Sequence, residues 1–170
     1  DGLATELRLN QANMPWHTNR TSMASLASHL SMVTGILGKI GQDIILMAQT
    51  EVGEIQISGG GGSSTMPQKV NPIAAETLVS LARFNAGLVG TMHQALIQEH
   101  ERGGPGWQME QLSLAQMVVA CGAALRHGED LLKGLTINSE RMRQNVDASN
   151  GLVLAEAATF ALAQHIGRLD

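Results

Sequence analysis

Residues 21–50 decide the fold class, and they read TSMASLASHLSMVTGILGKIGQDIILMAQT. Large apolar side chains recur here in alternating steps of three and four residues, the heptad pattern of a helix that packs against other helices. This seam consists of Met23, Leu26, Leu30, Val33, Leu37, Ile40, Ile44 and Met47. Residues 23–50 carry only two charges, Lys39 and Asp43. We therefore predict a long helix that is capped at Thr21 or Ser22 and has small, nearly uncharged outer faces.

Four more helices are predicted downstream. Asn71-Pro72 is typical of a helix start, with Asn71 as the N-cap and Pro72 at the first helical position, where its missing N–H costs no hydrogen bond. That helix runs toward Glu99, and further helices are predicted over 108–133, 139–146 and 152–166. Strand-like alternation never lasts beyond a few residues, and two tryptophans and two phenylalanines are the only aromatic residues. The predicted fold class is all-α, an elongated bundle of long helices.

The lengths of these helices indicate how the bundle is completed. A helix of about 28 residues is about 42 Å long, as long as a compact globule of this size is wide (~40 Å). Because the first two long helices have almost no charge on any face, we expect other subunits or further chain to cover them. We assign 1–135 to a central long-helix domain with a glycine-rich loop at 58–72. Residues 136–170 are assigned to the start of a smaller helical domain, and the chain is expected to be part of a longer polypeptide.

Composition excludes several classes of protein. The net charge of −4, from 11 basic and 15 acidic residues, lacks the positive charge of a nucleic-acid-binding protein. A single cysteine, Cys121, excludes a disulfide scaffold and fits a reducing compartment, so we expect a cytoplasmic protein. The longest unbroken apolar runs, such as 44–48, are well short of the roughly 20 residues that span a bilayer, so no membrane segment is expected.

The segment most informative about chemistry is 57–72, which reads ISGGGGSSTMPQKVNP. A flexible linker would explain the glycines and serines but not the residues that follow them. A phosphate-binding loop would need Ser or Thr after its lysine, whereas Val70 follows Lys69. The segment instead brings hydroxyl groups and a cation to the start of a helix, where free N–H groups favour anions. Such a site could hold a carboxylate while negative charge builds up beside it.

The run from Gly62 to Pro72 resembles the signature G-S-S-x-M-P-x-K-x-N-P of the fumarase/aspartase superfamily. Within the superfamily, further stretches are similar to the 3-carboxy-cis,cis-muconate cycloisomerases, namely 15–20, 49–54, 98–103, 106–110 and 151–157. Adenylosuccinate lyases share His100-Glu101-Arg102 but continue with an acidic residue and serines, whereas this chain continues with glycines. The resemblance implies a homotetramer of long helices, a small polycarboxylate substrate and lactone formation in aromatic-acid breakdown.

The resemblance also implies roles for residues of the motif. Ser63 would be the general base, while Lys69 and Asn71 would hold a substrate carboxylate. Ser64, Thr65 and Met66 would contact the substrate as well, through their backbone N–H groups. Glu76 matches a glutamate that orients a catalytic histidine from an earlier part of the chain in other members. The alternative for Glu76 is a first-turn carboxylate that is stabilised by the helix dipole.

Three cationic or potentially cationic side chains outside the motif are further candidates for substrate binding. His17 and Arg20 suit a substrate with several carboxylates, although a helix start with a solvated arginine would look the same. Arg102 is a third candidate, or merely a favourable charge near a helix C-terminus. We expect no metal and no cofactor, because His93 and His100 lack a third ligand. Two alternatives stay open for the whole chain: a fumarate-releasing lyase, or a catalytically incomplete oligomerisation core.

Overall fold

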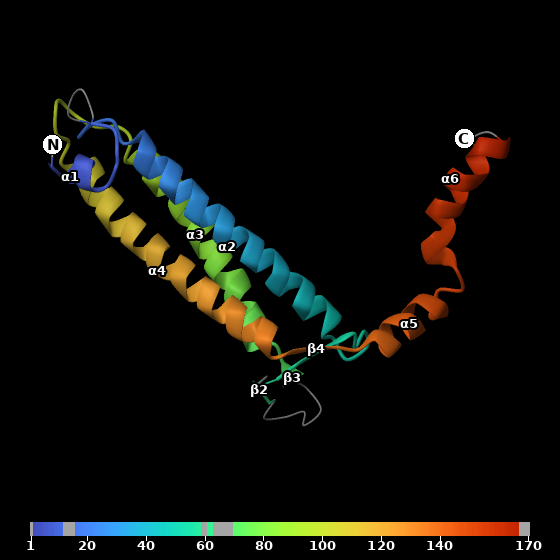
Figure 1. Ribbon diagram of the computed structural model, residues 1–170. Coiled ribbons are helices and arrows are strands. Elements are labelled where there is room, and N and C mark those ends of the chain that lie inside the picture. Colours follow the sequence, from blue (N-terminus) through green and yellow to red (C-terminus); the bar gives the residue numbers. More distant parts are fainter. Residues whose placement is uncertain (1, 12–15, 59–60, 63–69, 167–170) are drawn as a thin grey trace.

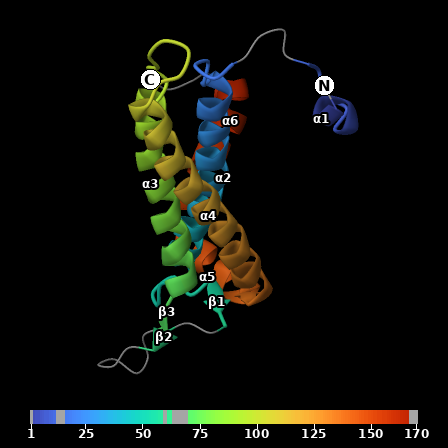
Figure 2. The ribbon, with the colours of Figure 1, turned by 90° about the vertical axis from the view of Figure 1, so that its left-hand side faces the viewer.

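A computed structural model of the chain describes residues 2–11, 16–58, 61–62 and 70–166. Its main body is a bundle of three long helices, which run down, up and down in the view of Figure 1: α2 (Thr21–Met47), α3 (Ile73–Gln94) and α4 (Pro105–Lys133). The view in Figure 2 shows the same three helices side by side along their length. A short helix, α1 (Gly2–Glu6), precedes them. The all-α fold predicted from the sequence is confirmed.

The described chain after the bundle forms strand β4 (Leu135–Ile137) and three short helical elements. They are α5 (Ser139–Ala148), the single-turn η1 (Leu152–Leu154) and α6 (Ala155–Ile166). Figure 1 shows α5 and α6 projecting from the end of the bundle where α2 and α4 finish. Gly151 separates α5 from η1 with a left-handed φ of 87°, a conformation that glycine adopts without steric cost.

The buried face of α2 differs from the predicted heptad seam. Of the eight seam residues only Ile44 is buried, whereas Leu26 and Val33 are exposed. The buried residues are mostly small, namely Ala24, Ala27, Thr34, Gly38, Gly41 and Ile44. Small residues occupy the buried face of α2 because α3 passes very close to it. A methyl group added at Gly41 would lie 2.6 Å from the Ala75 carbonyl oxygen.

Buried residues in all three helices recur every seven positions, the spacing of a left-handed coiled coil. The series are Ala27, Thr34 and Gly41 in α2, Leu78, Asn85 and Met92 in α3, and Met117, Ala124 and Leu131 in α4. Six of these nine residues belong to two apolar clusters, one around Leu78 and Leu131 and the other around Met92 and Met117. Asn85 lies between the two clusters along α3 and donates from Nδ2 to the Met117 carbonyl at 3.2 Å.

Two helix starts differ from prediction. The N-cap of α2 is Arg20 and not Thr21 or Ser22, and no side chain of the cap bonds to the helix. Asn19 Oδ1 instead accepts a hydrogen bond from the Thr21 hydroxyl at 2.7 Å. The α3 helix begins at Ile73 with Pro72 as its N-cap, so Asn71 is not the cap. Asn71 lies outside the helix because its backbone pairs with Gly61.

Two short strand pairs were not predicted. β1 (Ile55–Ile57) pairs antiparallel with β4 (Leu135–Ile137) just beyond the ends of α2 and α4. β2 (Gly61–Gly62) pairs antiparallel with β3 (Val70–Asn71). Strands of two or three residues are too short to show a sequence period.

By length and composition alone, α2 could cross a membrane, whereas the sequence analysis expected no such segment. A core helix of a helical bundle meets the same two criteria. In the structure α2 packs against α3 and α4.

Candidate active site

Strands β2 and β3, which contain the two ends of the sequence motif, lie at the end of the bundle where α2 ends and α3 begins (Figure 1). The pairs Gly61–Asn71 and Gly62–Val70 bring the two sides of the motif together just before α3. Ser63, Ser64, Thr65, Met66 and Lys69 lie outside the described residues, so their roles stay predictions. The strand pair nevertheless fixes where the motif leaves the bundle and where it returns.

Asn71 and Glu76 are the two motif-associated candidates that the structure describes. Asn71 is half-buried in β3, next to the helix start rather than on it. Glu76 lies in the first turn of α3, is exposed, and donates its backbone N–H to the Pro72 carbonyl at 3.0 Å. This location fits the favourable interaction of a carboxylate with a helix N-terminus. The orienting role of Glu76 remains a prediction.

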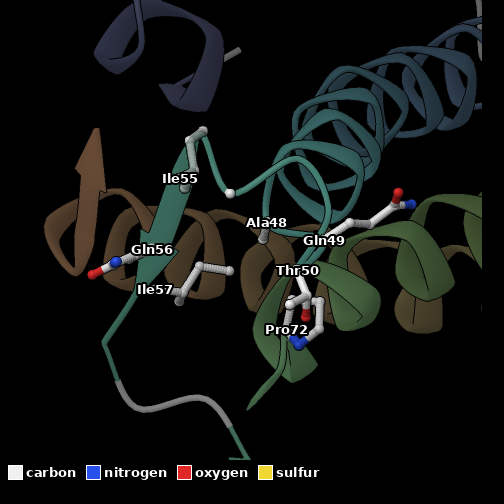
Figure 3. Close-up of a pocket in the computed structure, with 8 residues that line it drawn as sticks. Ala48, Gln49, Thr50, Ile55, Gln56, Ile57 and Pro72 are labelled. Carbon is white, nitrogen blue, oxygen red and sulfur yellow. The ribbon is translucent and has the colours of Figure 1, made fainter. Parts of the chain in front are cut away.

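A cavity of about 330 Å³ opens beside the motif, between the turn after α2, strand β1 and the start of α3. Figure 3 shows Gln49, Thr50 and Pro72 on one side of it and the residues of β1 on the other. Its lining is Ala48, Gln49, Thr50, Gly53, Ile55, Gln56, Ile57 and Pro72. Gln49 and Thr50 belong to one of the stretches that carry the family resemblance, and no site role was predicted for them.

Arg20 lies at the opposite end of the bundle, where α2 begins, and its predicted role in substrate binding stays a prediction. Its Nε donates to Glu110 Oε2 at 2.8 Å and a terminal nitrogen donates to Glu110 Oε1 at 2.5 Å. The two side chains are only 10% and 8% exposed. The hydrogen bond and the charge of Glu110 raise the pKa of Arg20 above its ordinary value, although burial acts in the opposite direction. Arg20 therefore has its carboxylate partner within the chain.

Arg102 and His17 share this end of the bundle and are both exposed. The Arg102 guanidinium lies over the Trp107 ring, 4.7 Å from its centre, an arrangement that holds the group in place without neutralising it. In the part of the chain that the structure covers, no carboxylate forms an ion pair with Arg102. Arg102 therefore remains able to bind an anion.

Sequence reasoning missed Glu110, although a signal was present. It is the only acidic residue of α4 before Glu129, and it precedes the buried Met117 by seven positions and Ala124 by fourteen. An acid on the buried face of an apolar helix needs a partner of opposite charge. Arg20 supplies it across 90 residues of sequence.

Other groups in the described ranges do not form a site. No cluster of three His, Cys, Asp or Glu side chains is placed there to hold a metal ion. Cys121 is buried in α4, and its burial raises the pKa of the thiol, which disfavours the nucleophilic thiolate. The expectation of no metal and no cofactor stays a prediction.

The chain is similar to known proteins in both sequence and structure. The sequence model of a family described as "Lyase" matches residues 2–85. The 3-carboxy-cis,cis-muconate cycloisomerase of Acinetobacter baylyi is 40% identical over 173 aligned residues, which cover all of this chain and 38% of that protein. The chain belongs to the fumarase/aspartase superfamily. The chain thus carries the superfamily signature at 62–72 and spans well under half of its relative's length.

Two further members of the superfamily support the alignment. The 3-carboxy-cis,cis-muconate cycloisomerase of Pseudomonas aeruginosa is 44% identical over 169 residues, 98% of this chain and 37% of that protein. The crystal structure of 3-carboxy-cis,cis-muconate lactonizing enzyme from Pseudomonas putida superposes with a TM-score of 0.82 at 41% identity. That superposition covers 98% of this chain and 37% of the solved one.

Proposed function

We propose that the protein containing this chain closes 3-carboxy-cis,cis-muconate into 4-carboxymuconolactone, a step of aromatic-acid breakdown. The observation that carries the proposal is the 44% identity to the Pseudomonas aeruginosa cycloisomerase, which extends over 98% of the chain. The segment after Arg102 adds support. Gly103 and Gly104 follow it, in place of the acidic residue and serines of adenylosuccinate lyases.

The proposed reaction adds a substrate carboxylate across a carbon–carbon double bond. One carboxylate oxygen bonds to one alkene carbon, the electron pair of the double bond moves to the neighbouring carbon, and that carbon takes up a proton. Negative charge builds up beside a second carboxylate, so cations and N–H donors around that carboxylate lower the barrier. We assign this role to Lys69, Asn71 and the N-terminus of α3. In the reverse elimination Ser63 takes the proton, and Glu76 is proposed to orient a histidine from elsewhere in the protein.

The candidate residues fall into two groups at opposite ends of the bundle. His17, Arg20 and Arg102 lie where α2 begins and α3 meets α4, whereas Asn71 and Glu76 lie at the far end (Figure 1). The 27 residues of α2 separate the two groups by about 40 Å. No small substrate spans that distance. A site that uses both groups must therefore combine one end of one copy with the opposite end of another, and the antiparallel packing of copies would achieve this.

Exposed apolar residues support such self-association, which we propose reaches a homotetramer. Ile36 of α2 is 65% exposed, and Leu112 and Val119 of α4 are 68% and 72% exposed. An open apolar cavity of about 420 Å³ lies between α3 and α4, beside Leu81, Phe84 and Val119. Exposed apolar surface of this kind is typical of an interaction site. In this assembly His17 and Arg102 would reach substrate carboxylates, while Arg20 would hold its end of the bundle together.

The proposal also covers binding partners, cofactors and cellular location. We propose a small polycarboxylate as the substrate, no nucleic acid or membrane partner, no metal or cofactor, and a cytoplasmic location. The net charge of −4 supports the absence of a nucleic-acid partner, and the single cysteine supports the location.

The test is a pair of assays on the protein expressed from its complete reading frame. Loss of the ultraviolet absorbance of 3-carboxy-cis,cis-muconate is expected, with no fumarate released from adenylosuccinate. Fumarate release without muconate turnover would overturn the proposal in favour of a fumarate-releasing lyase. The same muconate assay on the isolated 170-residue chain tests whether this part alone is active or is only an oligomerisation core.

A further inference from the structure

The turn that follows α2, residues 48–54, is held from outside by α5. Arg141 donates from Nε to the Val52 carbonyl at 3.0 Å and from a terminal nitrogen to the Glu51 carbonyl at 2.7 Å. Asn145, one helical turn further on, donates from Nδ2 to the Val52 carbonyl and to Glu54 Oε1, both at 2.9 Å. Four hydrogen bonds thus join two segments that are about 90 residues apart in sequence.

Three backbone N–H groups of the turn donate to carbonyl groups at its start and at the end of α2. The N–H groups of Val52 and Gly53 donate to the Gln49 carbonyl, at 3.0 and 2.7 Å, and the N–H of Glu54 donates to the Met47 carbonyl at 3.0 Å. The carbonyl groups of Glu51 and Val52 accept hydrogen bonds from α5 instead. Gly53 has a left-handed φ of 65°, and a methyl group added there would lie 3.6 Å from Arg141 Cγ. The Arg141 side chain therefore lies beside the residue of the turn that has a left-handed φ.

The same turn supplies the wall of the cavity beside the motif. Gln49 and Thr50 line it opposite β1, and Pro72 at the start of α3 closes it (Figure 3). β1 is fixed by the same part of the chain as the turn. It pairs with β4, Ser58 N–H donates to the Gly134 carbonyl at 2.9 Å, and Asn138 N–H donates to the Glu54 carbonyl at 2.9 Å. The region 134–145 therefore sets where the segment 49–58 lies relative to α3.

We propose that Arg141 is a positioning residue for the reaction: by holding the Glu51 and Val52 carbonyls it places Gln49, Thr50 and β1 against the start of α3. An arginine suits this task because its planar guanidinium donates to two carbonyl oxygens in one fixed geometry. Arg141 contacts no substrate and acts only through the turn. The effect on activity rests on the proposed function, whereas the effect on the turn does not.

The experiment compares Arg141→Ala with Arg143→Ala in the protein from the complete reading frame. Arg143 is a matched control because it lies on the same helix, two residues away, and forms only an exposed ion pair with Asp147. The first readout is hydrogen–deuterium exchange of the amides at 52–58. The second is the separate measurement of kcat and KM with 3-carboxy-cis,cis-muconate, with and without added guanidinium at low millimolar concentration. Asn145→Ala provides a second variant.

Arg141→Ala is expected to speed exchange at 52–58 while the centres of α2 and α4 stay protected. It should lower kcat roughly ten- to a hundredfold with a smaller change in KM. A mutation distant from the reacting atoms has effects of about this size when it misplaces the groups around the substrate by a small distance. Added guanidinium should restore part of kcat, and Asn145→Ala should act in the same direction. Arg143→Ala should match the parent protein in every readout.

Two results would overturn the inference. One is Arg141→Ala behaving like Arg143→Ala in both exchange and kcat. The other is faster exchange throughout the bundle with no rescue by guanidinium, because Arg141 would then support only overall stability. If the parent protein does not turn over the muconate, the proposed function fails, and the exchange data alone still decide whether Arg141 holds the turn.

Discussion

The Arg20 guanidinium and the Glu110 carboxylate meet at two points and fasten the start of α2 to the second turn of α4. Trp16 adds to this contact, because its ring centre lies 5.3 Å from Arg20 Cζ. The pair is buried, so neither charge is compensated by bulk water. Each charge therefore depends on the other.

Removing one partner of this pair should be costly. Glu110→Ala is expected to lower the free energy of unfolding by about 3–5 kcal/mol, because it leaves the Arg20 charge buried and unpaired. Urea unfolding at a fixed protein concentration measures the effect. Asp147→Ala is the control, since it breaks the exposed Arg143–Asp147 pair and should cost no more than about 0.5 kcal/mol. Equal losses in the two variants would contradict the structural role of the pair.

The close approach of α2 and α3 should not tolerate a methyl group. At Gly41 a new Cβ would lie 2.6 Å from the Ala75 carbonyl oxygen and 3.1 Å from Leu78 Cβ, so the helices would have to move apart. Gly41→Ala is expected to destabilise by about 1–3 kcal/mol in thermal or urea unfolding. Gly35→Ala on the same helix meets no atom within 4 Å and should change stability by less than about 1 kcal/mol. A neutral Gly41→Ala would show that the helices are less tightly packed.

Association of copies should depend on the exposed apolar face of α4. Val119→Glu is expected to shift the protein toward smaller species in light scattering, because it puts a charge on surface that association would bury. The melting temperature of the parent protein should rise with its concentration, and that of the variant should rise less. Lys133→Glu changes an exposed charge of the same helix and should leave the mass unaltered. A parent protein that is a stable monomer at micromolar concentration would rule out the proposed assembly.

The proposed base should affect turnover more than binding. Ser63→Ala is expected to lower kcat by about 10²–10⁴-fold, the usual contribution of a general acid–base group, with a much smaller change in KM. Lys69→Ala removes a cation from the carboxylate site, so KM should rise as well. Steady-state kinetics with 3-carboxy-cis,cis-muconate separate the two effects.

Ser64→Ala is the control for the base, since it removes a neighbouring hydroxyl from the same segment. If Ser64→Ala lowers kcat as far as Ser63→Ala, the segment matters as a whole and Ser63 is not the base. Near-normal turnover in Ser63→Ala would also remove the assignment, and the base would then have to come from another part of the protein.

The three long helices, their order and the superfamily could be predicted from the sequence, whereas the short helix α1 was not predicted. Apolar periodicity and helix-start residues act locally, so α2, α4 and α5 were predicted to within a few residues of their observed bounds. The signature at 62–72 is also local, because its residues are contiguous, and it identified the superfamily without any contact information. The roles of Ser63, Lys69 and the other residues of the signature remain predictions.

Which groups face one another depends on contacts between distant parts of the chain. The buried face of α2 is set by how closely α3 approaches Gly38 and Gly41, and a heptad count of large residues in α2 does not contain that distance. The partner of Arg20 lies 90 residues away, and β1 pairs with a strand about 80 residues further on, so neither could be found from neighbouring residues. Contacts of this kind depend on how the helices pack, and that packing also places the candidate residues about 40 Å apart, at opposite ends of one bundle.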